Sequence, residues 1–185
     1  HAHPLTPLAC WKLGAISLPL SVLFGPDALR YRLRDSGASV VVADESMLDT
    51  VRDVQADCPE LEHIVAVDAD SPDGEVERFD ELYAGHDTDL EVADTDEATP
   101  AIIIYTSGST GPPKGVLHGH GLWAGHCPAF YMYFERDVFG SVYWTPADWA
   151  WIGALGDVLF TAWHYGQPVV SYPMDGFEAE TAFEL

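Results

Sequence analysis

Positive charge is scarce in this sequence. Eight Lys and Arg residues are outnumbered by 30 Asp and Glu residues, which gives a formal net charge of −22. Lysine occurs only at Lys12 and Lys114. Such a surface repels the phosphates of DNA and RNA and the headgroups of anionic lipids. We therefore expect no nucleic-acid partner and no role at an anionic membrane surface.

Cysteines and long apolar runs are scarce as well. Cys10, Cys58 and Cys127 are odd in number and lack the spacing of metal or redox motifs. No apolar run is long enough to cross a bilayer, and no signal peptide with a basic start is present. We expect reduced thiols in a cytoplasmic protein without a membrane span.

The sequence has the size and composition of one folded unit. Its 185 residues are 48% hydrophobic, which is enough for a single core. Helix-like and strand-like segments alternate, as in an α/β fold whose sheets are flanked by helices. Because the chain starts without Met and stops at Leu185 directly after a helix-like stretch, we expect a fragment of a larger protein.

Apolar periodicity and local start and stop signals predict the elements. Pro26 and Gly37 bracket one helix as a first-turn residue and a terminator. The predicted helices are 8–16, 26–34, 46–56, 119–134, 149–165 and 176–185, and the predicted strands are 39–43, 63–67, 101–105, 116–118, 141–145 and 168–172. Residues 68–100 are polar and acidic, which predicts a surface excursion with one short helix around 79–83.

The segment most informative about function follows the apolar stretch 101–105. It combines four hydroxyl side chains with glycines and one of the two lysines: Thr106, Ser107, Gly108, Ser109, Thr110, Gly111, Lys114 and Gly115. Glycines let backbone amides approach an anion, hydroxyls donate to phosphate oxygens, and the ammonium neutralises charge. The segment predicts a polyphosphate-binding loop over 106–115. The alternative interpretation is a flexible Ser/Gly connection between two strands.

The loop differs from that of the common nucleoside triphosphatases. Their pattern places Gly-Lys-Ser/Thr at the start of a helix, whereas Pro112 and Pro113 precede Lys114 here and remove two amide donors. Hydroxyl groups must therefore make more of the phosphate contacts.

The run TSGSTGPPKGVLHGH, residues 106–120, resembles the signature loop of the adenylate-forming (AMP-binding) enzymes. The resemblance implies that this loop binds the β- and γ-phosphates of ATP while a carboxylic acid is activated to an acyl-adenylate. Residues 10–38 are similar to the family's early helix and the loop after it. Residues 144–153 look like the "ADxGW" segment of acetyl- and medium-chain acyl-CoA synthetases, with Ala150 where glycine is commoner.

The resemblance implies a fold, a reaction and its participants. Residues 1–185 would be part of the large N-terminal AMP-binding domain, with the C-terminal domain absent. The whole protein would use ATP, Mg²⁺ and coenzyme A to convert a carboxylic acid into its thioester. Its later nucleotide-binding motifs, hinge and catalytic lysine would follow Leu185, so we assign no catalytic residue here and expect the fragment alone to be inactive.

Three residues fall where the short-chain enzymes form their acyl pocket: Trp151, Ile152 and Gly153. Gly153 replaces a hydroxyl residue of the acetate-specific members, which implies an acid longer than acetate, medium-chain or branched, within fatty acid metabolism. The alternative is that these residues pack the core, as most aromatic and apolar helix stripes do.

Other polar residues suggest rival sites. His118, His120, His126 and Cys127 lack a carboxylate or second cysteine at ligand spacing, so we assign no metal ligands and expect histidines near the nucleotide or the acyl pocket. Asp148 and Asp157 could form an acid–base pair, but acyl adenylation depends on positioning and charge neutralisation, and Asp148 is expected to fix its turn or cap a helix.

Two further functions stay open. The chain could belong to a non-catalytic nucleotide-binding or scaffold module of the same fold, or to an adenylating ligase that transfers to a carrier-protein thiol. Residues after Leu185 distinguish the first possibility, and the choice of thiol acceptor distinguishes the second.

The acidic composition predicts a salt requirement typical of a halophilic protein. A net charge of −22 destabilises a compact state by self-repulsion, and salt shortens the screening length from ~10 Å at 0.1 M to ~3 Å at 1 M. We expect circular dichroism to report unfolding in dilute buffer and refolding in molar KCl. Full stability in dilute buffer would contradict this hypothesis.

Overall fold

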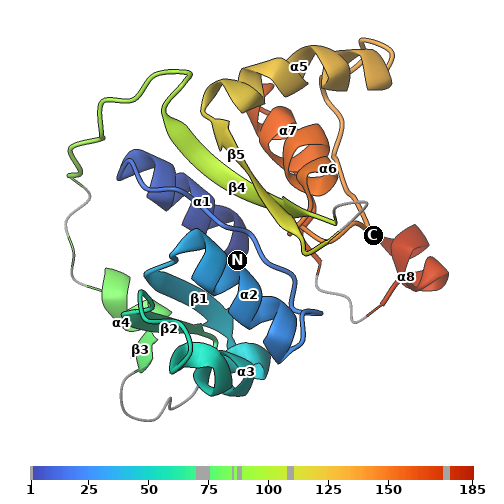
Figure 1. The fold of residues 1–185 in the computed structure, drawn as a ribbon. Helices are drawn as coiled ribbons and strands as arrows, with labels where there is room; N and C mark the ends of the chain where they lie inside the picture. Colours follow the sequence, from blue (N-terminus) through green and yellow to red (C-terminus); the bar gives the residue numbers. More distant parts are fainter. Residues whose placement is uncertain (1, 70–75, 85, 87–88, 108–110, 173–175) are drawn as a thin grey trace.

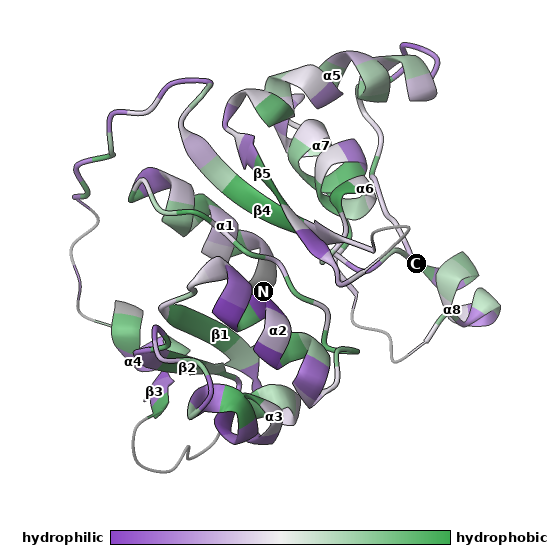
Figure 2. Cartoon of the chain, viewed as in Figure 1, coloured by the Kyte–Doolittle hydropathy of each residue, from purple (hydrophilic) through white to green (hydrophobic). Residues whose placement is uncertain are grey.

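The structure, a computed structural model, describes residues 2–69, 76–84, 86, 89–107, 111–172 and 176–185 (Figure 1). The described elements form a three-stranded parallel sheet and a two-stranded antiparallel sheet with helices packed against them. Hydrophobic residues concentrate on β1, on β4 and along the stretch from α6 to α7 (Figure 2). The α/β prediction is confirmed.

The parallel sheet has the order β1-β2-β3. Its strands are β1 (Val40–Asp44), β2 (His63–Val67) and β3 (Val76–Arg78). Helices α2 (Pro26–Ser36) and α3 (Glu45–Gln55) pack against this sheet. Gly37 ends α2 with φ of 66°, a backbone conformation that glycine adopts without a Cβ penalty. The side chain of Asp44 accepts a hydrogen bond from the Ser46 amide and so caps α3.

One core lies between these helices and the parallel sheet. Leu29 and Leu33 of α2 meet Val51 and Val54 of α3 over Ile64 of β2, and all five side chains are buried. The spacing of four between Leu29 and Leu33, and of three between Val51 and Val54, places each pair on one helix face. This periodicity explains why both helices were predicted close to their observed bounds.

The second sheet pairs β4 (Pro100–Thr106) with β5 (Lys114–Gly119). The other edge of β4 is occupied by Ser17, whose amide donates to Ala101 O and whose carbonyl accepts from the Ile103 amide, both at 2.9 Å. Ile102 and Ile104 are buried in a core with Leu155, Leu159 and Phe160. The strand that leads into the predicted loop is therefore held on both edges and packed into a core.

Helices α1 (Ala2–Lys12) and α5 (Gly121–Tyr133) also pack against this second core. Trp11 of α1 donates its indole N–H to Ala101 O at 2.8 Å, and its ring lies 5.0 Å from Trp123 and 4.8 Å from Phe160. A third core joins Phe130 of α5 to Tyr143. Helix α1 lies earlier than the predicted 8–16, because Gly14 leaves the helical conformation with φ of 72°.

The prediction of one long helix over 149–165 is wrong in two respects: the helix starts later, and it is not a continuous α-helix. The helix begins at Ile152 and consists of α6 (Ile152–Ala154), a π turn η1 (Leu155–Leu159) and α7 (Phe160–His164). A π turn contains one more residue per hydrogen-bonded loop than an α turn, so it cannot be read from apolar periodicity.

The strands predicted over 141–145 and 168–172 do not form in the described residues. The two segments meet in a single parallel bridge between Tyr143 and Val169. A strand requires a neighbour along several residues, and these segments have the apolar composition of strands without that pairing.

The acidic stretch from 68 to 100 contains β3 and the short helix α4 (Phe79–Tyr83). It returns to the second sheet past the end of α1, where the Ala93 amide donates to Lys12 O at 2.9 Å. Short helix α8 (Ala179–Glu184) follows the last bridge. Across the described residues, no helix is both long enough and apolar enough to span a membrane.

Candidate phosphate-binding site

The predicted loop leaves β4 and enters β5 at one end of the antiparallel pair (Figure 1). Thr106 is paired with Lys114, and Tyr105 is paired with Gly115. Directly opposed residues of an antiparallel pair point to the same face. The exposed Thr106 hydroxyl and the exposed Lys114 ammonium therefore project from the same face at the base of the loop.

The described loop residues are open to solvent or lie at the edge of the core. Ser107 is exposed, and Gly111 adopts φ of 87°, which permits a sharp turn before the two prolines. Gly108, Ser109 and Thr110 lie outside the described residues.

Gly115, the second residue of β5, has a packing role. A Cβ at this position would lie 3.0 Å from Ile103 Cγ2 and 3.2 Å from Tyr105 Cζ, closer than ordinary van der Waals contact. The absence of a side chain therefore lets β5 lie directly on the Tyr105 ring. Sequence reasoning assigned Gly115 to the shape of the loop, and the structure adds this close contact as the physical reason.

Lys114 carries a charge that no described carboxylate neutralises. Among the described residues, Arg30, Arg52 and Arg78 form ion pairs with carboxylates, and Lys114 forms none. An exposed ammonium beside a hydroxyl-rich turn is suited to a phosphate ligand.

The predicted acyl-pocket residues divide between surface and core. Trp151 directly precedes α6 and is 46% exposed. Gly153, the second residue of α6, is also exposed. Ile152 packs against the second core, so the core interpretation applies to this residue. A Cβ on Gly153 would lie 3.7 Å from Asp157 Oδ2, so a carboxylate bounds the space that this glycine leaves.

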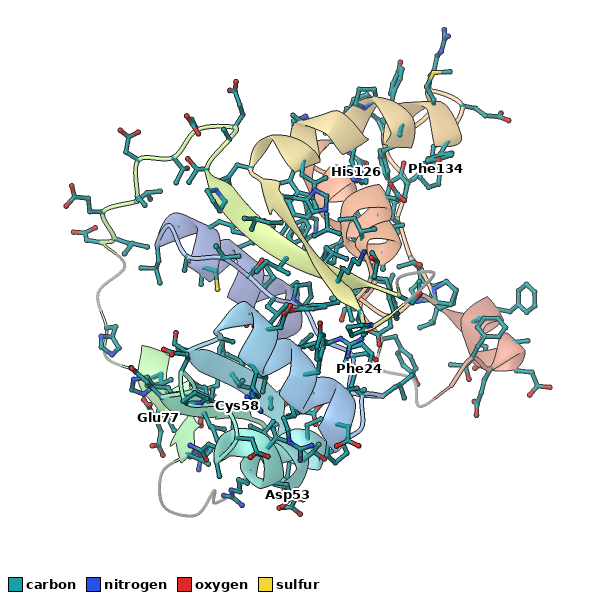
Figure 3. The ribbon with its side chains drawn as sticks, in the orientation of Figure 1. Phe24, Asp53, Cys58, Glu77, His126 and Phe134 are labelled. Carbon is teal, nitrogen blue, oxygen red and sulfur yellow. The ribbon has the colours of Figure 1, made fainter. Side chains whose placement is uncertain are left out.

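A His–Asp pair lies next to these residues. His126 Nδ1 is 2.7 Å from Asp157 Oδ1, and both side chains are partly exposed. Asp157 belongs to the π turn, and His126 lies on the side of α5 that faces it (Figure 3). Gly156 makes room for the imidazole, because a Cβ there would lie 3.0 Å from His126 Cε1.

Asp148 has a different environment and does not pair with Asp157. Its Oδ1 accepts a hydrogen bond from the Ala150 amide at 2.8 Å, and its Oδ2 accepts one from the Ser21 hydroxyl. Asp148 therefore fixes the turn before α6, which is one of its two predicted roles, and it connects this turn to the segment before α2.

The sequence predicts no metal ligands among His118, His120, His126 and Cys127. Within the described ranges, no cluster of three or more His, Cys, Asp or Glu side chains is arranged to hold a metal ion. His120 instead lies edge-on to the Trp11 ring at 6.3 Å. All three cysteines are free, and burial raises the pKa of each thiol.

Comparison with known proteins identifies the family. The family profile described as "AMP-binding enzyme" matches residues 1–184. The chain belongs to this AMP-binding family.

Curated relatives of this AMP-binding chain are acyl- and acetyl-coenzyme A synthetases by name. Acyl-coenzyme A synthetase ACSM4 of Homo sapiens is 27% identical over 180 residues, which cover 96% of this chain and 30% of that protein. Acetyl-coenzyme A synthetase 2 of Pseudomonas aeruginosa is 32% identical over 167 residues, covering 83% of this chain and 26% of that protein. The chain therefore spans less than a third of the length of these relatives.

Solved structures agree with the AMP-binding fold. The anthranilate CoA ligase AuaEII, in complex with anthranoyl-AMP, superposes with a TM-score of 0.75 at 27% identity, over 88% of this chain and 32% of that one. An acyl-CoA synthetase of Brucella canis gives a TM-score of 0.76 at 25% identity, over 97% of this chain and 32% of that one. The predicted N-terminal domain fold of adenylate-forming enzymes is confirmed.

Sequence reasoning missed the partner of His126. The histidine and Asp157 are 31 residues apart on different helices, and no local pattern relates them. Gly156 was the one available signal, since a glycine inside an apolar helix often marks a close approach.

Two glycine substitutions test the packing around this pair. Gly156→Ala should lower the free energy of unfolding by about 1–3 kcal/mol, because the added methyl group collides with a rigid imidazole ring. Gly125→Ala, at an exposed position of α5 with no neighbouring atom within 4 Å, should raise it by about 0.5–1 kcal/mol. Urea unfolding in molar KCl measures both. Equal effects of the two substitutions would contradict the close approach.

Proposed function

We propose that the protein containing this chain is an AMP-forming acyl-CoA synthetase. It would activate a carboxylic acid with ATP and transfer the acyl group to coenzyme A. The observation that carries the proposal is the hydroxyl- and lysine-bearing loop at the end of buried β4, within a chain that matches the AMP-binding family over residues 1–184. The names of its relatives support the same reaction class.

In the first half-reaction, a carboxylate oxygen of the acid attacks the α-phosphorus of ATP. The bond between that phosphorus and the bridging oxygen breaks, pyrophosphate leaves with the electron pair, and an acyl-adenylate remains. Such a displacement is accelerated by positioning and by neutralising the charge of the leaving group. Thr106, Ser107, Ser109, Thr110 and Lys114 would bind the departing phosphates.

In the second half-reaction, the thiol of coenzyme A attacks the acyl carbonyl. The thiol proton is released, the bond between the acyl carbon and the phosphate oxygen of the mixed anhydride breaks, and AMP leaves with its electron pair. Mg²⁺ would arrive with ATP, held largely by phosphate oxygens and water. We place this reaction in a salt-adapted cytoplasm, on the basis of the net charge of −22 and of the free cysteines.

The proposed acid is longer than acetate, medium-chain or branched, in keeping with fatty acid metabolism. Gly153 supports this choice because it contributes no side chain to the proposed acyl pocket. The relatives differ in the acids that their names print, from acetyl to anthranilate, so the acid must be determined directly.

Acid-dependent ATP–pyrophosphate exchange tests the proposal. The full-length protein would be assayed in molar KCl with acids from acetate to octanoate and with branched and aromatic acids. Exchange with the longer acids is the expected result. Product analysis with free coenzyme A and with a carrier protein then identifies the thiol acceptor. A folded protein that exchanges with no acid contradicts the proposal and favours a non-catalytic module.

The two lysines provide a matched pair of variants. Lys114→Ala should reduce exchange by about tenfold to a hundredfold, the range for one hydrogen bond to a charged group. Lys12→Ala removes the same charge from the exposed end of α1 and should leave exchange unchanged. If the two variants behave alike, Lys114 does not bind the phosphates.

A further inference from the structure

Helix α2 is hydrogen-bonded to both ends of the phosphate loop. The Tyr31 hydroxyl donates to Pro113 O at 2.9 Å, immediately before Lys114. The Tyr105 hydroxyl, from the last buried residue of β4, donates to Asp35 Oδ2 at 2.6 Å. Tyr31 and Asp35 are four residues apart and therefore share one face of α2. A single helix face thus contacts the chain where it enters and where it leaves the loop.

The packing around these bonds makes the contact tight. The rings of Tyr31 and Tyr105 meet edge to face at 6.3 Å. The guanidinium of Arg32, a buried residue, lies 5.4 Å from the Tyr105 ring and 4.1 Å from the Phe24 ring. Because cations are attracted to aromatic faces, Arg32 adds to the attachment of α2 to the end of β4.

Movement of Tyr105 would be transmitted to β5, the strand that begins with Lys114. Gly115 lies against the Tyr105 ring with no room for a Cβ, and it directly follows Lys114. The Tyr105 phenol keeps its proton, because burial and the hydrogen bond to Asp35 raise its pKa. It can therefore donate to Asp35 throughout the neutral pH range.

We propose that Tyr31 and Asp35 are positioning residues, which hold the two ends of the phosphate loop in place before the nucleotide binds. The proposal rests on the phosphate-binding function proposed above for the loop. Neither residue needs to touch the ligand. Their contribution is preorganisation, since a loop that is already ordered loses less conformational entropy when it binds.

Tyr31→Phe in the full-length protein tests the contact at Pro113. The substitution removes one hydroxyl and leaves the ring, so the Michaelis constant for ATP in pyrophosphate exchange should rise about fivefold, the factor for one net hydrogen bond. The Michaelis constant for the acid should not change.

Tyr165→Phe is the matched control. Its hydroxyl also donates to a backbone carbonyl, that of Cys127 at 3.2 Å, but in the α5–α7 region. This variant should lose similar stability and keep the wild-type Michaelis constant for ATP. An unchanged value in Tyr31→Phe, or an equal rise in Tyr165→Phe, would overturn the proposal.

The Asp35 contact has its own pair of variants. Asp35→Ala removes the acceptor for Tyr105 and should raise the Michaelis constant for ATP as Tyr31→Phe does. Asp35→Asn keeps an acceptor oxygen and should restore most of the wild-type value. Equal defects in the two variants would count against hydrogen bonding as the cause.

Amide hydrogen exchange tests the anchoring without any catalytic readout. In the full-length protein without nucleotide, Tyr31→Phe should accelerate exchange in peptides covering β5 about fivefold, while Tyr165→Phe should not. Unchanged β5 exchange in Tyr31→Phe would refute the anchoring. A wild-type protein that shows no pyrophosphate exchange with any acid would contradict the proposed function alone, since hydrogen exchange still decides the role of Tyr31.

Discussion

The structure depends on the burial of β4. Its backbone is hydrogen-bonded to Ser17 on one edge and to β5 on the other, and Ala101 and Ile102 are fully buried. The indole of Trp11 adds a further bond to Ala101 O. Strands with both edges paired and one apolar face in a core have little freedom to shift register. The loop after Thr106 therefore starts from a fixed point, and helices α1, α5 and α7 are arranged around the same strand.

Elements with local signals were predictable from the sequence. Pro26 and Gly37 bracket α2, and the apolar stretch of β2 has the bounds that its composition predicts. The π turn and the single bridge between Tyr143 and Val169 were not predictable, because they depend on which distant segments become neighbours. Apolar periodicity describes a residue's burial but not its hydrogen-bonding partner.

The same distinction applies to the site. The composition of the loop predicted a phosphate-binding segment, since the necessary groups are adjacent in the sequence. The residues that contact its ends could not be recognised, because Tyr31 is 82 residues from Pro113 and Asp35 is 70 residues from Tyr105. A tyrosine and an aspartate on an amphipathic helix look like ordinary surface residues until the tertiary structure places them.

The π turn in η1 has a consequence for how this family can diversify. An α-helix becomes a π turn when one residue is inserted, and the helix on either side keeps its own geometry. Asp157 lies in this turn, opposite His126 and beside Gly153. A single-codon insertion or deletion could therefore bring a carboxylate to this position or remove it, while the core residues Leu155 and Phe160 remain in the same helix. Length variation in one helix offers a route to new side-chain combinations that point mutation alone would reach only in several steps.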